Sequence, residues 1–157
     1  MSDEVTTAQR RPSRIELGRY LTEVGALRPE WKAAFEALPR EWFLPDLMWA
    51  YDMASGTSEA VSRSSDPTAW ESTADANVPL VTQWDDGHHT GTAPGTEATS
   101  SSSMPTLVFD MLHDLDVHPG HKILEIVLRP AAAGGEVLSR LWLPVRGTCV
   151  KNTDAYL

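Results

Sequence analysis

The sequence predicts an α/β fold in which N-terminal helices precede the start of a parallel sheet. Apolar residues recur at helical spacing in the first third of the chain, which indicates amphipathic helices. A further helix begins near Pro105, and a Pro-Gly turn separates it from Lys122–Val127, a short run of mostly apolar residues. Such a run is typical of a strand buried in a parallel sheet. The chain has 157 residues, of which 41% are hydrophobic, and this is enough for one domain.

The composition narrows the classes of partner. The formal net charge is −9 and the pI is near 4.9, so electrostatic repulsion disfavours nucleic acids and anionic membranes. Cys149 is the only cysteine, which excludes an internal disulfide and fits a reducing compartment. The sequence shows no N-terminal signal segment and no apolar run of membrane-spanning length, and we therefore expect a cytoplasmic protein. None of these features indicates an oligomeric state.

The N-terminal part is expected to contain a disordered tail, residues 1–13, and a helical segment, residues 14–53. The tail is polar. In the helical segment, Gly25 ends a first helix, Pro29 opens a second one, and Pro39 closes it. The apolar stripes of the two helices consist of Leu17, Tyr20, Leu21 and Val24, and of Trp31, Ala34, Phe35 and Leu38.

Residues 54–104 are expected to form a loop-rich segment with one short strand. Glycine, serine, threonine and proline dominate residues 54–73, which predicts a loop. The strand is expected at residues 77–84 (NVPLVTQW), where apolar and β-branched residues gather. Residues 85–102 are again polar and rich in turn-forming residues.

Residues 105–157 are expected to begin with a helix, a turn and a strand. Pro105 suits the start of the helix, and Ser103 can cap the free amides there. His118-Pro119-Gly120 stops the helix and turns the chain toward the strand at Lys122–Val127. The apolar face of the helix is expected to consist of Val108, Met111, Leu112 and Leu115.

Three stretches of the chain resemble, in the same order, segments of the protein-L-isoaspartate O-methyltransferase family. The first is Arg40-Glu41-Trp42-Phe43-Leu44-Pro45 with the following Tyr51-Asp52, the second is Ser103-Met104-Pro105 with its helix, and the third is Pro119-Gly120 followed by Ile123-Leu124-Glu125-Ile126. These enzymes transfer a methyl group from S-adenosylmethionine to a rearranged aspartyl carboxylate. The resemblance covers approximately residues 17–126.

This resemblance implies a fold and a set of site residues. The fold would be an incomplete Rossmann-like methyltransferase domain, residues 105–157, preceded by N-terminal helices. Ser103 would be the catalytic residue beside the methyl-transfer site, and Glu125 and Ile126 would bind S-adenosylmethionine. The partner would be a protein or peptide substrate with an aspartyl or isoaspartyl residue. Similarity to the branch that modifies ribosomally made peptides implies a dedicated precursor peptide as one form of this substrate.

The chain departs from the family pattern directly after Ile126. A glycine-rich loop is expected there, but Val127, Leu128, Arg129 and Pro130 follow instead, and their side chains occupy the space where the cofactor would lie. One hypothesis is a frameshift or premature stop in the gene. An alternative function is therefore a truncated, non-catalytic fragment, or a peptide-binding module that uses the N-terminal helices and the aromatic residues between Trp42 and Trp49. Taken alone, those aromatic residues are more typical of the core.

The remaining polar clusters indicate ordinary structural roles. Asp85-Asp86 with His88-His89 could be drawn as a metal site, but adjacent residues on a loop rarely converge on one ion, and we expect no metal. Asp114 and Asp116 suit a helix end better than an acid–base pair. Ser103 itself is explained equally well as a helix cap, as a site residue, or as both.

Overall fold

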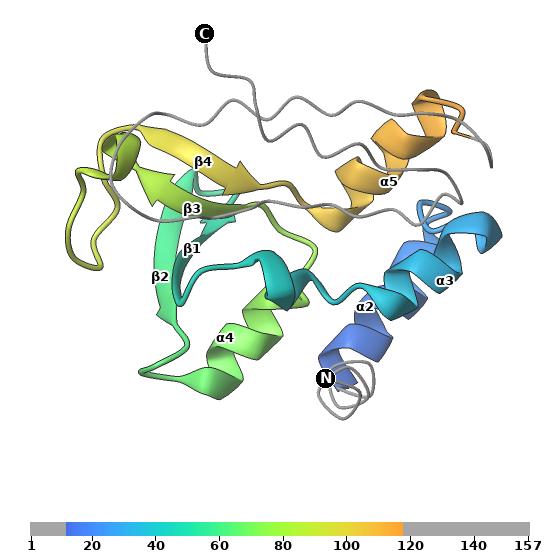
Figure 1. Ribbon diagram of the computed structural model, residues 1–157, viewed down its shortest axis with the longest axis horizontal. Coiled ribbons are helices and arrows are strands. Elements are labelled where there is room, and N and C mark those ends of the chain that lie inside the picture. Colours follow the sequence, from blue (N-terminus) through green and yellow to red (C-terminus); the bar gives the residue numbers. More distant parts are fainter. Residues whose placement is uncertain (1–11, 118–157) are drawn as a thin grey trace, which may run out of the picture.

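The structure of the protein is a computed structural model, in which residues 12–117 are described. This part has a mixed α/β fold, with a four-stranded antiparallel sheet and four α-helices (Figure 1). The strands are β1 (Leu47–Asp52), β2 (Thr57–Ser62), β3 (Leu80–Trp84) and β4 (Ala98–Ser102), and the α-helices are α2 (Pro12–Glu23), α3 (Pro29–Ala37), α4 (Pro67–Ala74) and α5 (Pro105–Asp114). Two short 3-10 helices, η1 (Arg40–Phe43) and η2 (Asp85–Gly87), lie between these elements.

The helical pair α2 and α3 forms where the apolar periodicity predicts it. Gly25 has a φ of +79°, a conformation that suits glycine and that turns the chain between the two helices. The interior that these helices share with α5 consists of Leu17, Leu21, Ala26, Leu27, Trp31, Ala34, Phe109 and Leu112. Of the apolar stripe expected on α2, Leu17 and Leu21 are buried as predicted. Tyr20 and Val24 are 45% and 50% exposed, so the prediction is wrong for these two residues.

The sheet has the strand order β2-β1-β3-β4, and every neighbouring pair is antiparallel. One row of partners crosses the whole sheet, since Ala50 pairs with both Glu59 and Leu80, and Leu80 pairs in turn with Ser102. This register puts the start of β3 and the end of β4 at the same end of the sheet as the end of β1. A β-bulge interrupts the pairing of β3 with β4 between Val81 and Trp84.

Each face of the sheet carries its own apolar cluster. Helix α4 covers one face, where Met48, Trp70, Ala74 and Leu80 are fully buried. The opposite face carries Trp49, Val81 and Trp84, each at most 9% exposed. Side chains alternate between the two faces of a strand, so Met48 and Trp49 point in opposite directions. Figure 1 shows α4 on one side of the sheet and the α2–α3 pair beside it.

Helix α5 confirms the helix expected after Pro105, but it buries a different side. Phe109 and Leu112 pack against α2 and α3, whereas Met111 and Leu115 are 46% and 64% exposed. The predicted face was therefore shifted by part of a turn. Periodicity alone could not decide this, because apolar residues occur nearly all round the helix.

Regular structure is more extensive than the sequence predicted. The stretch of residues 54–73, expected as a loop, contains β2 and most of α4, and residues 47–52 of the segment expected to be helical form β1. The strand expected at residues 77–84 is confirmed as β3, and β4 lies in the stretch expected to be turns. Residues 12 and 13 of the expected tail belong to α2.

Local signals for the missed elements are present in the sequence. Asp66 caps α4, its side chain accepting a hydrogen bond of 3.0 Å from the amide of Ala69, and Pro67 occupies the first turn. Gly56 has a φ of +70° and closes the hairpin between β1 and β2. An Asp-Pro start and a glycine turn therefore outweigh the loop-like composition of this stretch.

Several expectations lie outside the described residues. They are the turn at His118-Pro119-Gly120, the strand at Lys122–Val127 with Glu125 and Ile126, the bulky stretch that follows it, and most of the expected tail. Among residues 12–117, none of the helices combines the length and the apolar character that a membrane crossing demands.

Candidate functional site

The turn that carries Ser103 is anchored by one arginine side chain. Arg40, at the start of η1, donates hydrogen bonds to the carbonyl oxygens of Ser102 at 2.9 Å and Ser103 at 2.8 Å. Its Nε also donates to the hydroxyl of Ser102 at 3.0 Å. Two more bonds, each of 3.2 Å, reach the carbonyl oxygens of Ala76 and Val78. Five bonds from one planar guanidinium hold the end of β4 and the approach to β3 in one arrangement.

The charged side chains of Asp75 and Arg14 form a second network, and the charge of Asp75 acts on Arg40. The carboxylate of Asp75 is fully buried, accepts a hydrogen bond of 2.8 Å from Ser13 and lies 3.7 Å from the guanidinium of Arg14. Burial lowers the pKa of Arg40 to about 10, and the charge of Asp75 partly offsets this decrease. Arg40 therefore keeps its positive charge at neutral pH.

Asn77 supplies the cap that the sequence assigned to Ser103. The N-cap residue of α5 is Met104, which makes no side-chain capping bond. Instead, Oδ1 of Asn77 accepts hydrogen bonds from the amide of Thr106 at 2.9 Å and from its hydroxyl at 2.8 Å. The expectation that Ser103 caps the helix is therefore wrong, because Met104 occupies the N-cap position and Asn77, 29 positions before Thr106, accepts the bond from the Thr106 amide.

The register of the sheet brings Tyr51 to the same end as Ser103. Beyond the row of Ala50, Leu80 and Ser102, the next residues along the three strands are Tyr51, Pro79 and Ser103. The amide of Tyr51 extends the ladder by donating to the carbonyl oxygen of Pro79 at 3.0 Å. Neighbouring strands lie about 4.8 Å apart, so the backbones at Tyr51 and Ser103 are about 10 Å apart.

Asp52, which follows Tyr51, is used by the hairpin turn. Its carboxylate accepts hydrogen bonds of 2.8 Å from the amide of Ala54 and from the hydroxyl of Ser55. These two bonds, that of Ser55 first, lower the pKa of Asp52. The Asp52 carboxylate therefore stabilises the turn that follows Tyr51. Tyr51 itself is 36% exposed.

Ser103 carries one of the hydroxyl groups at this end of the sheet. The anchor uses its carbonyl oxygen and leaves the half-buried side chain outside the bonds to Arg40. A hydroxyl can donate one hydrogen bond to a carboxylate oxygen. The Ser103 hydroxyl can thus donate to an acidic group of a ligand, while Arg40 holds the backbone of Ser103.

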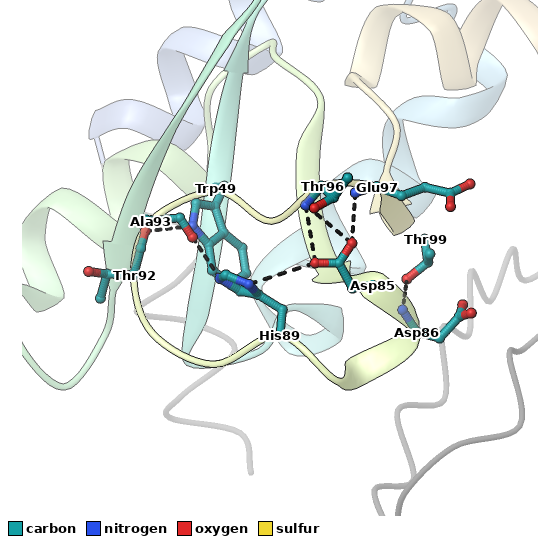
Figure 2. A network of polar contacts seen from close by, with 9 residues as sticks. All are labelled: Trp49, Asp85, Asp86, His89, Thr92, Ala93, Thr96, Glu97 and Thr99. Carbon is teal, nitrogen blue, oxygen red and sulfur yellow. Dashed lines mark hydrogen bonds and ion pairs between the residues drawn. The ribbon is translucent and has the colours of Figure 1, made fainter.

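A second polar cluster, shown in Figure 2, lies in the loop of residues 85–97. The carboxylate of Asp85 accepts hydrogen bonds from the amides of Thr96 and Glu97, and the bond from Glu97 is 2.8 Å long. Nδ1 of His89 lies 3.8 Å from the same carboxylate. In the part of the chain that the structure describes, no group of three or more His, Cys, Asp or Glu side chains could hold a metal ion.

The loop of residues 85–97 lies against the sheet face that carries Trp49. The indole Nε1–H of Trp49 donates to the carbonyl oxygen of Thr92 at 2.9 Å, and the ring of His89 meets the ring of Trp49 at 6.1 Å with edge-on geometry (Figure 2). Gly95 lies so close to Trp84 that an added Cβ would come within 2.6 Å of its side chain. This stretch, expected to be polar turns, is therefore a closed and well-bonded loop.

Sequence reasoning singled out Ser103 as a candidate and Tyr51-Asp52 as part of the resemblance, but it missed the residues that hold them in place. The roles of Arg40, Asn77 and Asp75 depend on partners 29 to 63 positions away in the chain. Arg40 stands in the stretch that carries the resemblance, and this was the one available signal for it. Nothing local distinguishes Asn77 or Asp75 from other residues of a loop.

The chain was compared with protein-family models, with curated proteins and with solved structures. None of the three comparisons finds a match.

Proposed function

We propose that this protein is related to the protein-L-isoaspartate O-methyltransferases and uses S-adenosylmethionine to methylate an aspartyl or isoaspartyl carboxylate of a protein or peptide. Ser103 would lie beside the reacting carboxylate. The proposal includes a Rossmann-like continuation of the chain after α5 and action in the cytoplasm, without a nucleic-acid or membrane partner.

One observation carries the proposal. The stretches that bear the resemblance within the described residues are far apart in the chain, yet they converge at one end of the sheet. Arg40 of the first stretch bonds directly to the carbonyl oxygen of Ser103 in the second, at 2.8 Å. Tyr51 lies in the adjacent register row. Sequence segments that jointly build a site are expected to meet in space, and these do.

The chemistry requires positioning more than proton transfer. A carboxylate is already a nucleophile, so the acceptor needs no general base. Ser103 can donate a hydrogen bond to one carboxylate oxygen and leave the other free to attack. Arg40 holds the main chain from which the Ser103 side chain extends.

The methyl donor would be held by residues outside the described range. Glu125 and Ile126 are the expected contacts, and S-adenosylmethionine when bound supplies an activated methyl group on a sulfonium centre. The bulky residues from Val127 to Pro130 oppose this expectation. Binding of the cofactor is therefore the first property to measure.

The alternative function, a non-catalytic peptide-binding module, finds partial support in one residue. Trp42 on η1 is 44% exposed and could contact a peptide. Trp49, by contrast, is 5% exposed and bonded to the loop of residues 85–97. A module of this kind would therefore depend on Trp42 and not on the full aromatic stretch.

The test combines cofactor binding with methyl transfer. The full chain is titrated with S-adenosylmethionine by calorimetry and then assayed with a radiolabelled donor and an isoaspartyl peptide. We expect saturable binding, and we expect Ser103→Ala to lower kcat/KM by about 10- to 100-fold, the loss that one hydrogen bond to a charged group causes. Ser101→Ala, on the exposed part of β4, serves as the control and should retain activity.

Two results would contradict the proposal. A cooperatively folded chain that binds no S-adenosylmethionine would favour the peptide-binding module. Equal activity of the Ser103→Ala variant and the unmodified chain would remove Ser103 from the site, even if methyl transfer occurred.

A further inference from the structure

Asp86 and Gly87 form the only Asp-Gly step in the sequence, and the sequence contains no Asn-Gly step. Both residues lie in the loop of residues 85–97, and both are exposed to solvent. Glycine has no Cβ, so the main-chain nitrogen that follows Asp86 is open to close approach. An aspartyl carboxyl group beside such a nitrogen can close a cyclic imide with the main chain. This step is therefore a place where the main chain can rearrange.

The two residues occupy the centre of a hydrogen-bonded β-turn. The amide of His88 donates to the carbonyl oxygen of Asp85 at 2.9 Å, and this bond closes the turn over the pair. Asp86 has a φ of 54° and a ψ of 29°, and Gly87 has a φ of +83°. These angles match a type I′ turn, in which both central residues have positive φ. The fold therefore holds Asp86 in the left-handed region, which is unfavourable for residues other than glycine.

One rotation in this turn brings the nitrogen of Gly87 to the side chain of Asp86. When the peptide plane between them flips, the turn becomes type II′, in which the first central residue keeps its positive φ and has a ψ of about −120°. At this ψ the following nitrogen eclipses Cβ, because Cβ stands about 120° from the residue's own nitrogen around the Cα–C bond. The turn bond does not involve the flipped plane. Nor does the bond of 3.0 Å from the Asp86 amide to the hydroxyl of Thr99.

The carboxylate of Asp86 is available for reaction, whereas that of its neighbour Asp85 is not. Within residues 12–117 the Asp86 carboxylate makes no hydrogen bond or ion pair. Figure 2 shows it pointing away from the contacts of Asp85. The carboxylate of Asp85, in contrast, is held by the amides of Thr96 and Glu97. The exposed and unbonded carboxylate is thus the one that precedes the glycine.

We propose that Asp86-Gly87 is a site of spontaneous modification, at which the main chain rearranges from an aspartyl to an isoaspartyl linkage without an enzyme. The nitrogen of Gly87 attacks Cγ of Asp86. One carboxyl oxygen leaves as water, together with the carboxyl proton and the amide proton. Water then attacks the main-chain carbonyl carbon of the imide, the bond from this carbon to nitrogen breaks, and residue 86 becomes linked through its side chain. One water is released and one is taken up, so no other reagent is needed.

The rearrangement changes the loop, because an isoaspartyl residue adds one carbon atom to the main chain. The bond from His88 to Asp85 spans this residue, so the turn has to change its shape. The loop also lies over Trp49, whose indole donates to the carbonyl oxygen of Thr92. An aged chain therefore carries an altered loop on this face of the sheet. This inference does not depend on the proposed enzymatic function.

The experiment follows isoaspartate in the folded chain. The chain is incubated at physiological pH and temperature in water enriched in the heavy oxygen isotope, and is then cut after glutamate to release residues 72–97. Electron-transfer fragmentation in the mass spectrometer locates isoaspartate among the three aspartates of this peptide. We expect isoaspartate to accumulate over weeks at Asp86, several-fold above the other two, and at least as fast as in a synthetic peptide of residues 80–92. Each isoaspartyl residue should carry at least one heavy oxygen, because water opens the imide.

Two glycine variants separate the turn from general ageing of the loop. Gly87→Ala puts a Cβ beside the attacking nitrogen and opposes the positive φ, so isoaspartate at Asp86 should fall many-fold. Gly91→Ala is the matched control, since Gly91 has a φ of +100° in the same loop and open space around it, and isomerisation should be unchanged. Far-UV circular dichroism checks that each variant is folded.

Three results would overturn the proposal. The first is isoaspartate that forms in the synthetic peptide but not in the folded chain. The second is an equal amount at all three aspartates of residues 72–97, and the third is a Gly87→Ala variant that isomerises as fast as the unmodified chain.

Discussion

Arg40 shows how a single side chain can hold together parts of a chain that are distant in sequence. Its guanidinium bonds to the main chain at Ala76 and Val78 before β3 and at Ser102 and Ser103 after β4. Its planar fork suits several carbonyl oxygens at once, which a lysine ammonium could not match. The position of Ser103 is thus determined by a residue 63 positions away.

Replacement of Asn77 tests which residue caps α5. Asn77→Ala removes both hydrogen bonds to Thr106, and we expect the free energy of unfolding to fall by about 1 kcal/mol. Ser103→Ala should change it by less than about 0.5 kcal/mol, because its side chain does not cap the helix. Urea denaturation of both variants gives the comparison. A larger loss for Ser103→Ala than for Asn77→Ala would restore Ser103 as the cap.

At the scale of elements, α4 is the helix whose packing defines one face of the sheet. Trp70 is its fully buried centre, packed with Met48 and Leu80, and its Nε1–H donates to the carbonyl oxygen of Pro45 at 3.1 Å. The guanidinium of Arg63 covers its ring at 4.8 Å. A single large side chain therefore connects α4, both central strands and the segment before β1.

Truncation of Trp70 should be among the most damaging changes to the sheet. Trp70→Ala leaves a cavity and an unsatisfied carbonyl oxygen, and we expect a loss of about 3–5 kcal/mol in the free energy of unfolding. The matched control is Trp42→Ala, since Trp42 is 44% exposed and its loss should cost less than about 1 kcal/mol. Similar losses for the two variants in urea denaturation would contradict the described packing of α4.

At the scale of the whole molecule, two packed regions meet along a charged seam. One region is the interior shared by α2, α3 and α5, and the other is the sheet with α4. Asp75, at the end of α4, accepts a hydrogen bond from Ser13 of α2 and pairs with Arg14. Arg14 in turn donates to the carbonyl oxygens of Phe35 and Leu38, so the seam reaches α3 as well.

Neutralisation of Asp75 should weaken the docking of the helices on the sheet. Asp75→Asn removes the buried negative charge that pairs with Arg14, and we expect a loss of about 3 kcal/mol in the free energy of unfolding. The urea transitions followed by far-UV circular dichroism and by tryptophan fluorescence should then separate, because the two regions no longer unfold together. Asp46→Asn, at an exposed carboxylate bonded to Ser62 and Ser64, is the control. Coincident transitions at unchanged stability would show that the seam is not needed for docking.

The sequence by itself determined the elements whose signals are local. The periodicity around Trp31, the prolines at positions 29 and 105, and the run before Trp84 predict α3, α5 and β3, and the structure confirms them. A helix stripe or a strand run lies within a few residues, so no distant partner is needed to detect it. Composition misled at residues 54–73, where the Asp66-Pro67 start of α4 and the glycine turn after β1 were overlooked, and again at residues 98–102, which form β4.

Tertiary structure alone decided the antiparallel order of the sheet, the side of α5 that is buried, and the contacts of Ser103 and His89. Each of these depends on groups that the fold brings together from different parts of the chain, such as Arg40 with Ser103, Phe109 with Phe35, or His89 with Asp85 over Trp49. The physical reason is that hydrogen bonds and charge pairs depend on distance in space. Residue spacing in a sequence reports that distance only within one helix or one strand.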